Sequence, residues 1–179
     1  MKKRLLLVLA VLLLLTTCAI DSSLAQDLIV WQPGVKLKWA DFLAKPEKHN
    51  PASALTTSGI HYHGEIKDSG VVDTIAAIFY EDQSWVRRRS DRLLLHEQGH
   101  FDITEIYARR LRKRIVEIPV RSDKPEFQLP LIYYVVEAER RKTENLYDEE
   151  TDHGKNEEGQ SRWNDKIRAE LDSLKQFAR

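Results

Sequence analysis

The segment from residue 90 to residue 117 constrains the fold of this 179-residue chain more than any other part. Ser90 or Asp91 can cap a helix, no proline or β-branched run interrupts the residues after them, and Pro119 lies just beyond the end. The sequence therefore predicts one long helix over this segment.

Two histidines fall on the apolar side of this helix. At about 100° per residue, that side points into the protein, and it carries Leu93, His96, His100, Ile103, Tyr107 and Leu111. The opposite side is polar, and we expect it to meet solvent. It carries Gln98, Asp102, Glu105, Arg109, Arg112 and Lys113.

His96 and His100 frame the pentapeptide HEQGH, an HExxH pattern. Residues i and i+4 share a helix face, so both imidazoles can bind one Zn²⁺, while Glu97 can act on a water as general base. The alternative is a pair of hydrogen-bonded core histidines. A carboxylate beside two buried imidazoles is costly unless a cation offsets it, which favours the metal site.

The first 25 residues have the pattern of a signal peptide. A basic start (residues 2–4) precedes an apolar run (residues 5–15) that is short for a membrane span. Small residues at 23 and 25 predict cleavage before Gln26 and an exported protein, periplasmic or secreted. Lipid attachment at Cys18 is the rival, but Thr17 fits its usual pattern poorly.

Composition after residue 25 predicts a single domain, residues 26–179, without a thiol. Over the whole chain, basic and acidic residues balance at 28 each, so no overall field favours nucleic acid or anionic lipid as a partner. We interpret the local basic runs at 87–89 and 109–114 as solvated helix faces. The expected partner is a peptide or protein substrate, and the oligomeric state stays open.

Residues 28–82 look rich in β-structure. Short apolar stretches alternate with proline, glycine and asparagine, and they predict strands at 28–31, 35–39, 54–65 and 71–80. Residues 68–70 predict a hairpin turn. His61 and His63 share a strand face and could bind metal, but an exposed face is the preferred interpretation because a third partner is missing.

The C-terminal part predicts two further helices. A polar loop at 121–130 leads to a helix at 131–145, whose start could also be a strand, and a polar stretch at 147–160 leads to a terminal helix at 161–177. An antiparallel or mixed sheet followed by an HExxH helix and two more helices predicts an α+β, zincin-like fold.

A catalytic zinc usually has a third protein ligand, and the polar stretch is its best source. His153 is the first choice and Asp148 the second, either as ligand or as the acceptor that orients an imidazole. Glu144 is the third choice. Glu105 is near in sequence, but it lies about 180° from His96 on a straight helix, and we interpret it as structural.

Several blocks together resemble a known family. They are Trp39–Phe42, Ser84-Trp85, the helical segment 94–102, Ala108-Arg109, the block 147–154, Gln160 and Trp163. These features resemble a bacterial family of predicted secreted zinc-dependent proteases, catalogued as a domain of unknown function and grouped with the zincins. The resemblance implies a zincin fold and roles for His96, Glu97 and His100, and it places His153 and Asp148 in a shared block.

The leading hypothesis is an exported zinc metallopeptidase that cleaves peptide bonds with a zinc-activated water and Glu97 as general base. Tyr147 is the candidate donor to the oxyanion, and a strand at 58–66 could pair with an extended peptide. One alternative is an envelope binding or assembly module that keeps zinc without turnover. Another is an amidase acting on cell-wall peptides. The substrate does not follow from the sequence.

Overall fold

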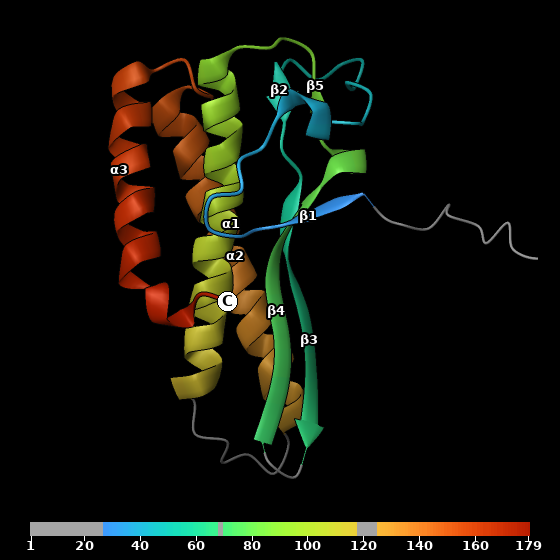
Figure 1. Cartoon of the computed structure of the whole chain (residues 1–179), viewed down its shortest axis with the longest axis vertical. Coiled ribbons are helices and arrows are strands. Elements are labelled where there is room, and N and C mark those ends of the chain that lie inside the picture. The colour runs from blue at the N-terminus through green and yellow to red at the C-terminus, as the bar shows by residue number, and fades with distance from the viewer. Residues whose placement is uncertain (1–26, 68–69, 118–124) are drawn as a thin grey trace, which may run out of the picture.

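The computed structural model describes residues 27–67, 70–117 and 125–179. Strands come first and helices follow, which confirms the predicted α+β class (Figure 1). The strands are β1 (Leu28–Val30), β2 (Ala54–Leu55), β3 (Ser58–Lys67), β4 (Gly70–Tyr80) and β5 (Trp85–Val86). The helices are α1 (Asp91–Glu117), α2 (Pro125–Thr151) and α3 (Glu157–Ser173), with single 3₁₀ turns at Trp39–Asp41, Glu81–Gln83 and Lys175–Phe177.

The predicted signal peptide and Cys18 lie outside the described residues. Within the described part, no helix has the length and apolar character needed to cross a membrane.

The strands form two small antiparallel sheets. In the larger one the order is β1-β4-β3, and β3 and β4 form the predicted hairpin, paired from Ser58 with Phe79 to Lys67 with Gly70. Residues 68 and 69 of the predicted turn lie outside the described residues. The smaller sheet pairs β2 with β5.

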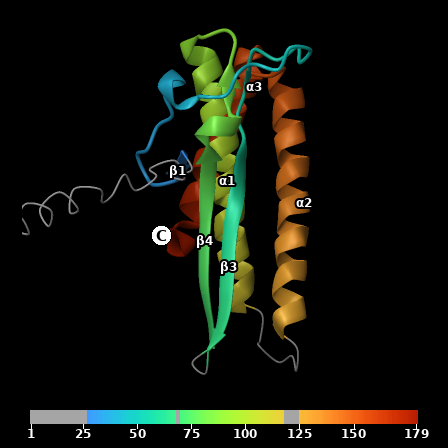
Figure 2. The same cartoon turned by 90° about the vertical axis from the view of Figure 1, so that its right-hand side faces the viewer.

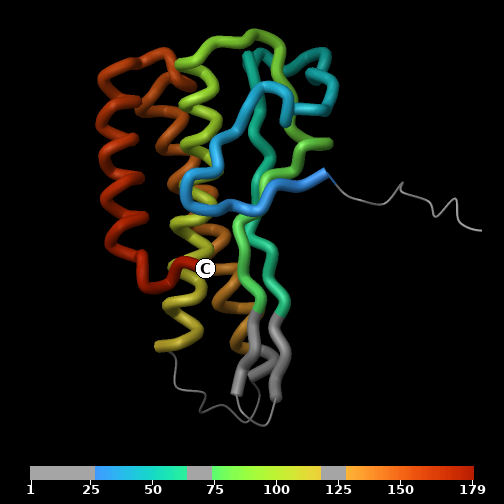
Figure 3. The backbone as a smooth tube through the Cα atoms, viewed as in Figure 1, coloured from blue at the N-terminus to red at the C-terminus, as the bar shows by residue number. Residues whose placement is uncertain are grey.

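The strand predicted at 35–39 does not form. After β1 the backbone instead crosses α1 (Figure 3), where Leu37 is buried and its N–H donates to Gln98 Oε1 at 2.8 Å. Trp31 also reaches α1, because its indole N–H donates to Asp102 Oδ1 at 2.7 Å. Bonds to helix side chains thus replace the ladder that a strand would need.

Helix α1 is the centre of the fold. It packs against α2, α3, β3 and β4, so that the long hairpin lies along it on one side and the other helices lie along it elsewhere (Figures 1 and 2). Its N-cap is Ser90, one of the two predicted candidates, because Ser90 Oγ accepts the N–H of Leu93 at 3.1 Å. The core includes the fully buried side chains of Ile75, Phe79, Phe101, Leu111, Val136 and Tyr147.

The polar side of α1 does not meet solvent, so that prediction was wrong for most of its members. Gln98, Glu105, Arg109 and Arg112 are all buried. Glu105 Oε1 accepts from Arg109 Nε at 2.9 Å and from an Arg112 guanidinium N–H at 3.1 Å. Charges that pair with each other inside the protein can occupy a face that an apolar/polar pattern assigns to water.

Helix α2 is longer than predicted at both ends. The loop expected at 121–130 is helical from Pro125, a residue type that is favoured at a first helical position, and the alternative strand near residue 132 does not form. Residues 118–124 lie outside the described residues. The polar stretch predicted at 147–160 supplies the last turn of α2, and α3 begins at Glu157, where the Asn156 side chain accepts from the N–H of Gly159.

Candidate metal centre

Three potential ligand atoms meet between α1 and the end of α2. His96 Nε2 and His100 Nε2 each lie 3.1 Å from Asp148 Oδ1, and the three donor atoms lie within 4.8 Å of one another. Among the described residues, this is the one group of three or more histidine, cysteine and carboxylate side chains close enough to hold an ion. Two imidazoles and a carboxylate form a donor set that suits zinc.

Asp148 reaches the histidines because α2 continues through residue 151. The polar character of residues 147–151 predicts a loop, but their helical conformation puts Asp148 and Thr151 on the side of α2 that faces His96. Asp148, the second choice for the third ligand, therefore lies where His153, the first choice, was expected.

His153, the first choice, lies outside the group of three. Its Nδ1 is 3.5 Å from Asp148 Oδ1, and its side chain is 66% exposed at the turn between α2 and α3. Glu144, the third choice, also lies outside. Its Oε1 accepts from an Arg140 guanidinium N–H at 2.6 Å, and burial is the main reason why its pKa is raised.

Residues from α2 and α3 fix the ring of His96. Its Nδ1 lies 3.1 Å from Gln160 Oε1 and 3.4 Å from Thr151 Oγ1. Gln160 Nε2 donates to Tyr147 Oη at 2.7 Å, so the amide oxygen of Gln160 is the atom left to accept the imidazole N–H. With an ion bound, this bond would leave the Nε2 lone pair of His96 to point toward the ion, whereas without one the same nitrogen can donate to Asp148.

Tyr147 has a structural position and not the one expected for an oxyanion donor. Its side chain is fully buried, its ring stacks on His96 at a centroid distance of 4.6 Å, and its hydroxyl donates to the carbonyl oxygen of His96 at 3.0 Å. Burial is the main reason why its pKa is raised. With its proton already used and its ring outside the cavity lining, Tyr147 holds His96 in place.

Two glycines allow these close approaches. A Cβ at Gly99 would lie 2.2 Å from Tyr147 Oη, and a Cβ at Gly154 would lie 2.8 Å from His96 Cβ. Gly154 also ends a run of left-handed residues with Asp152 and His153, at φ values of 45°, 51° and 78° in chain order. The glycine of HEQGH is thus explained by the tyrosine that covers it.

The group of three opens into a cavity of about 740 Å³. The cavity is lined by residues 50–56, 88–90, 92, 93, 144, 145 and 153–155, in addition to His96, Glu97, His100 and Asp148. Glu97 is 3% exposed, yet within the described part of the chain no side chain or N–H donates to its carboxylate. Its backbone carbonyl accepts from Thr56 Oγ1 at 3.4 Å. Because Glu97 has no oxygen that is both fully enclosed and unpartnered, its carboxylate borders the cavity and is open to what the cavity holds.

The charges of the site are strongly coupled. Burial alone would raise the pKa of Asp148, but hydrogen bonds from His100 and His96 together with their charges lower it well below its usual range. Burial likewise opposes protonation of His100, but its bond to Asp148 and the nearby charges of Glu97, Asp148 and Glu144 raise its pKa. Without an ion, these shifts favour a protonated His100 beside an ionised Asp148.

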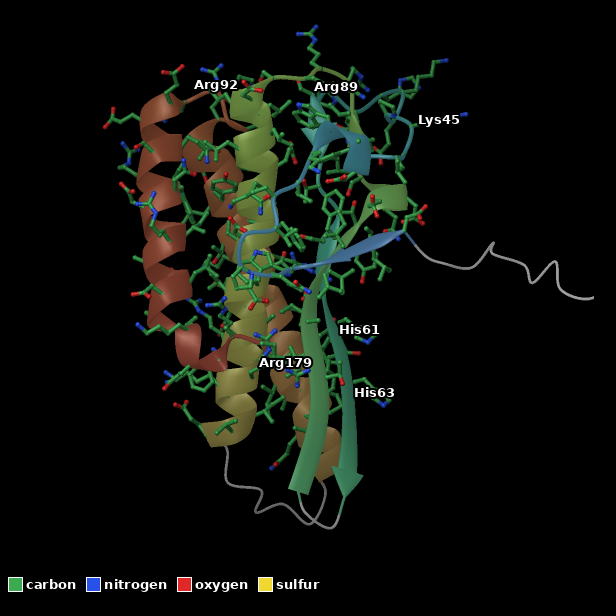
Figure 4. All side chains as sticks on the ribbon, viewed as in Figure 1. Lys45, His61, His63, Arg89, Arg92 and Arg179 are labelled. Carbon is green, nitrogen blue, oxygen red and sulfur yellow. The ribbon has the colours of Figure 1, made fainter. Side chains whose placement is uncertain are left out.

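The remaining histidine pair lies elsewhere. His61 and His63 are both exposed on β3, as the preferred interpretation held, and Figure 4 places them along the hairpin and away from the upper end of α1.

One family model matches the chain. Residues 79–154 match the family described as bacterial protein of unknown function (DUF922). The matched part runs from the end of β4 to Gly154 and contains Glu97 and all three donors. It agrees with the resemblance to a bacterial family of unknown function and carries no activity with it. No curated protein and no solved structure matches the chain.

Gln160 and Thr151 both contact His96, but the sequence predicts no role for either residue. Gln160 was part of the family resemblance, but neither its side chain nor its position predicted a bond to His96, 64 residues away. A usable signal was the spacing of Tyr147, Asp148 and Thr151 at three and four residues, which is helical.

Proposed function

We propose that this protein is an exported, zinc-dependent metallopeptidase with a zincin-like active site. The observation that carries the proposal is the close approach of His96, His100 and Asp148 beside a buried carboxylate that has no partner among the described residues. Structural zinc sites usually close with four protein ligands, whereas catalytic sites have three and an open position. Three donors at the floor of a cavity fit the second pattern.

Each residue has a defined task in this proposal. His96, His100 and Asp148 hold the ion, and Gln160 orients His96. Zinc supplies Lewis acidity, which lowers the pKa of a water and polarises a carbonyl. Glu97 takes the proton of the attacking water and returns it to the leaving amine, because it lines the cavity beside the ligands and no protein donor among the described residues occupies its oxygens.

Metal analysis tests the ligand set. We expect near-stoichiometric zinc in residues 26–179, and loss of zinc in His96→Ala and Asp148→Ala. His153→Ala should keep its zinc, since that side chain lies outside the group of three. His61→Ala and Asp152→Ala are matched controls, because both positions are exposed. Zinc that survives Asp148→Ala but not His153→Ala would overturn the assignment of the third ligand.

Glu97→Gln tests catalysis separately from binding. The zinc content should stay at the wild-type level, while hydrolysis of a mixed set of fluorogenic peptides should fall by roughly 10²–10⁴-fold, as expected for the loss of a general base. A wild-type protein that holds zinc but cleaves no peptide would favour the binding or assembly module. A wild-type protein without zinc would remove the basis of the proposal.

A further inference from the structure

The mouth of the cavity is basic. Arg88, Arg89, Arg92 and Lys155 all line it. Figure 4 shows Arg89 and Arg92 at the upper end of the molecule, where α1 begins. Two of these four cations are paired: Arg92 lies 2.6 Å from Glu157, and Lys155 lies 3.3 Å from Asp152.

Arg88 and Arg89 are different. Both are exposed, and in residues 27–67, 70–117 and 125–179 neither side chain has an ion-pair or hydrogen-bond partner. The prediction that they belong to a solvated helix face was wrong, because they lie between β5 and the first residue of α1. Two adjacent guanidinium groups without partners are available to bind an anion.

The neighbouring Arg87 holds this segment in place. Its guanidinium donates to the carbonyl oxygens of Glu47, Asn50 and Ala52 at 2.6–2.9 Å. The backbone N–H groups of Arg87 and Arg88 both donate to Ser53. With Ser90 fixed as the N-cap of α1, the two free arginines are held at both ends of a short segment, so binding by them costs little backbone ordering.

The cavity also contains acidic groups, but they do not neutralise the arginines. Glu144 is bonded to Arg140, and Asp148 is bonded to the two histidines. Glu97 lies in the second turn of α1 beside His96. A bound divalent ion would offset the charges of Asp148 and Glu97, which leaves an excess of positive charge at the mouth.

We propose that Arg88 and Arg89 bind a carboxylate of the substrate, so that the enzyme prefers anionic peptides. This inference rests on the proposed peptidase function. The start of α1 lies about 8 Å along the helix axis from His96, at 1.5 Å per residue. An extended peptide advances about 3.3 Å per residue. The carboxylate therefore belongs to a residue two to three positions from the scissile bond, either as an Asp or Glu side chain or as the chain terminus.

Peptide binding by the zinc-loaded Glu97→Gln protein tests the preference without turnover. Three peptides of one length carry Glu, Gln or Lys at every position outside the centre, and each is made with a free and an amidated C-terminus. We expect the Glu peptide to bind roughly 10–100-fold more tightly than the Gln peptide, as for charge-assisted bonds to arginine. A preference that persists after amidation assigns a side-chain carboxylate, and one that disappears assigns the terminus.

Charge reversal locates the effect. Arg88→Glu/Arg89→Glu should shift the preference from the Glu peptide to the Lys peptide. Arg168→Glu/Lys175→Glu changes the net charge equally at side chains that are 77% exposed on and after α3, and it should leave the preference unchanged. Equal shifts in both variants would indicate overall charge and overturn the inference, as would equal binding of Glu and Gln peptides by the parent.

The outcomes keep this inference separate from the proposed function. Hydrolysis of Glu and Gln peptides by the wild-type protein at equal rates would leave the peptidase standing and remove the preference. Tight binding of the Glu peptide with no hydrolysis would leave the basic mouth standing and remove the peptidase.

Discussion

Helix α1 buries charge on two of its faces, and the two clusters are built differently. Around Glu105, the protein satisfies every group: the carboxylate accepts from Arg109 and Arg112, and both arginines also donate to backbone carbonyls, among them those of Leu171 and Ile75. Around Asp148, two imidazoles approach a single oxygen atom, while the carboxylate of Glu97 has no donor within the described residues.

The difference separates a structural cluster from a site that needs a ligand. Buried ionic groups that are fully paired need nothing from outside, whereas a carboxylate without a donor beside two imidazoles would be stabilised further by a bound cation. The two clusters lie on the same helix and include similar residue types. Their partners, and not their composition, distinguish them.

The largest expected effect comes from breaking the structural cluster. Glu105→Ala leaves Arg109 and Arg112 buried without their shared carboxylate, so the free energy of unfolding should fall by about 3–5 kcal/mol, measured by urea denaturation. Glu139→Ala is the matched control, since Arg114 and Glu139 keep 36% and 40% of their side chains exposed. Equal losses in the two variants would contradict the contrast between paired burial and surface pairing.

A smaller effect is expected from the residue that orients a ligand. Gln160→Leu keeps most of the volume but removes the acceptor for His96 Nδ1, so the affinity for zinc should fall by roughly 10–100-fold, as measured by competition with a chelator. Asn164, which bonds only to Gln160 among the described side chains, provides the control variant Asn164→Leu. An unchanged affinity in Gln160→Leu would show that Tyr147 and Thr151 suffice to hold the ring.

The smallest effect is a dependence on pH. In the metal-free protein, the raised pKa of His100 stabilises the fold below about pH 6.5, and this contribution is lost as the pH rises through the folded pKa. The lowered pKa of Asp148 contributes above about pH 3.9 and is lost only as the pH falls through its folded value.

Zinc reverses the first of these trends. Zinc binds neutral imidazoles, so it must displace the proton of His100. This displacement costs less free energy at high pH, where His100 has already lost its proton. The difference in Tm between zinc-loaded and metal-free protein should therefore widen from pH 6 to pH 8, as measured by differential scanning calorimetry. In Glu105→Gln the same widening should persist, since that cluster does not contact the site. A difference in Tm that stays constant over this range would contradict the coupling.

Local patterns in the sequence were sufficient for the helix of the HExxH motif and for the β3-β4 hairpin. The cap at Ser90 is encoded within a few positions, and the pairing of β3 with β4 agrees with the predicted hairpin. The strand predicted at 35–39 failed because its apolar residues pack on α1 individually, with Leu37 bonded to Gln98. Bonds between distant segments are not visible in local periodicity.

That Asp148 lies closer than His153 to His96 and His100 did not follow from the sequence, for a related reason. Helix α2 continues to Thr151 through buried positions that are mostly polar, such as Glu137 and Arg140. Apolar residues at helical spacing end before Asp148, so the remainder of the helix resembles a loop in the sequence. Which side of α2 faces His96 depends on how two helices pack, and the order of residues along either helix does not fix that packing.

Asp148 and His96 stand 52 residues apart in the chain. An ion bound between them would join the second turn of α1 to the last turn of α2 and so close a loop, much as a disulfide does. Because the chain has no cysteine after residue 25, such a link would restrict the unfolded chain in a way that no disulfide there could, as well as serve the active site. The metal would then serve both the chemistry and the stability of the fold. Its removal by a chelator would first cause fraying at the end of α2.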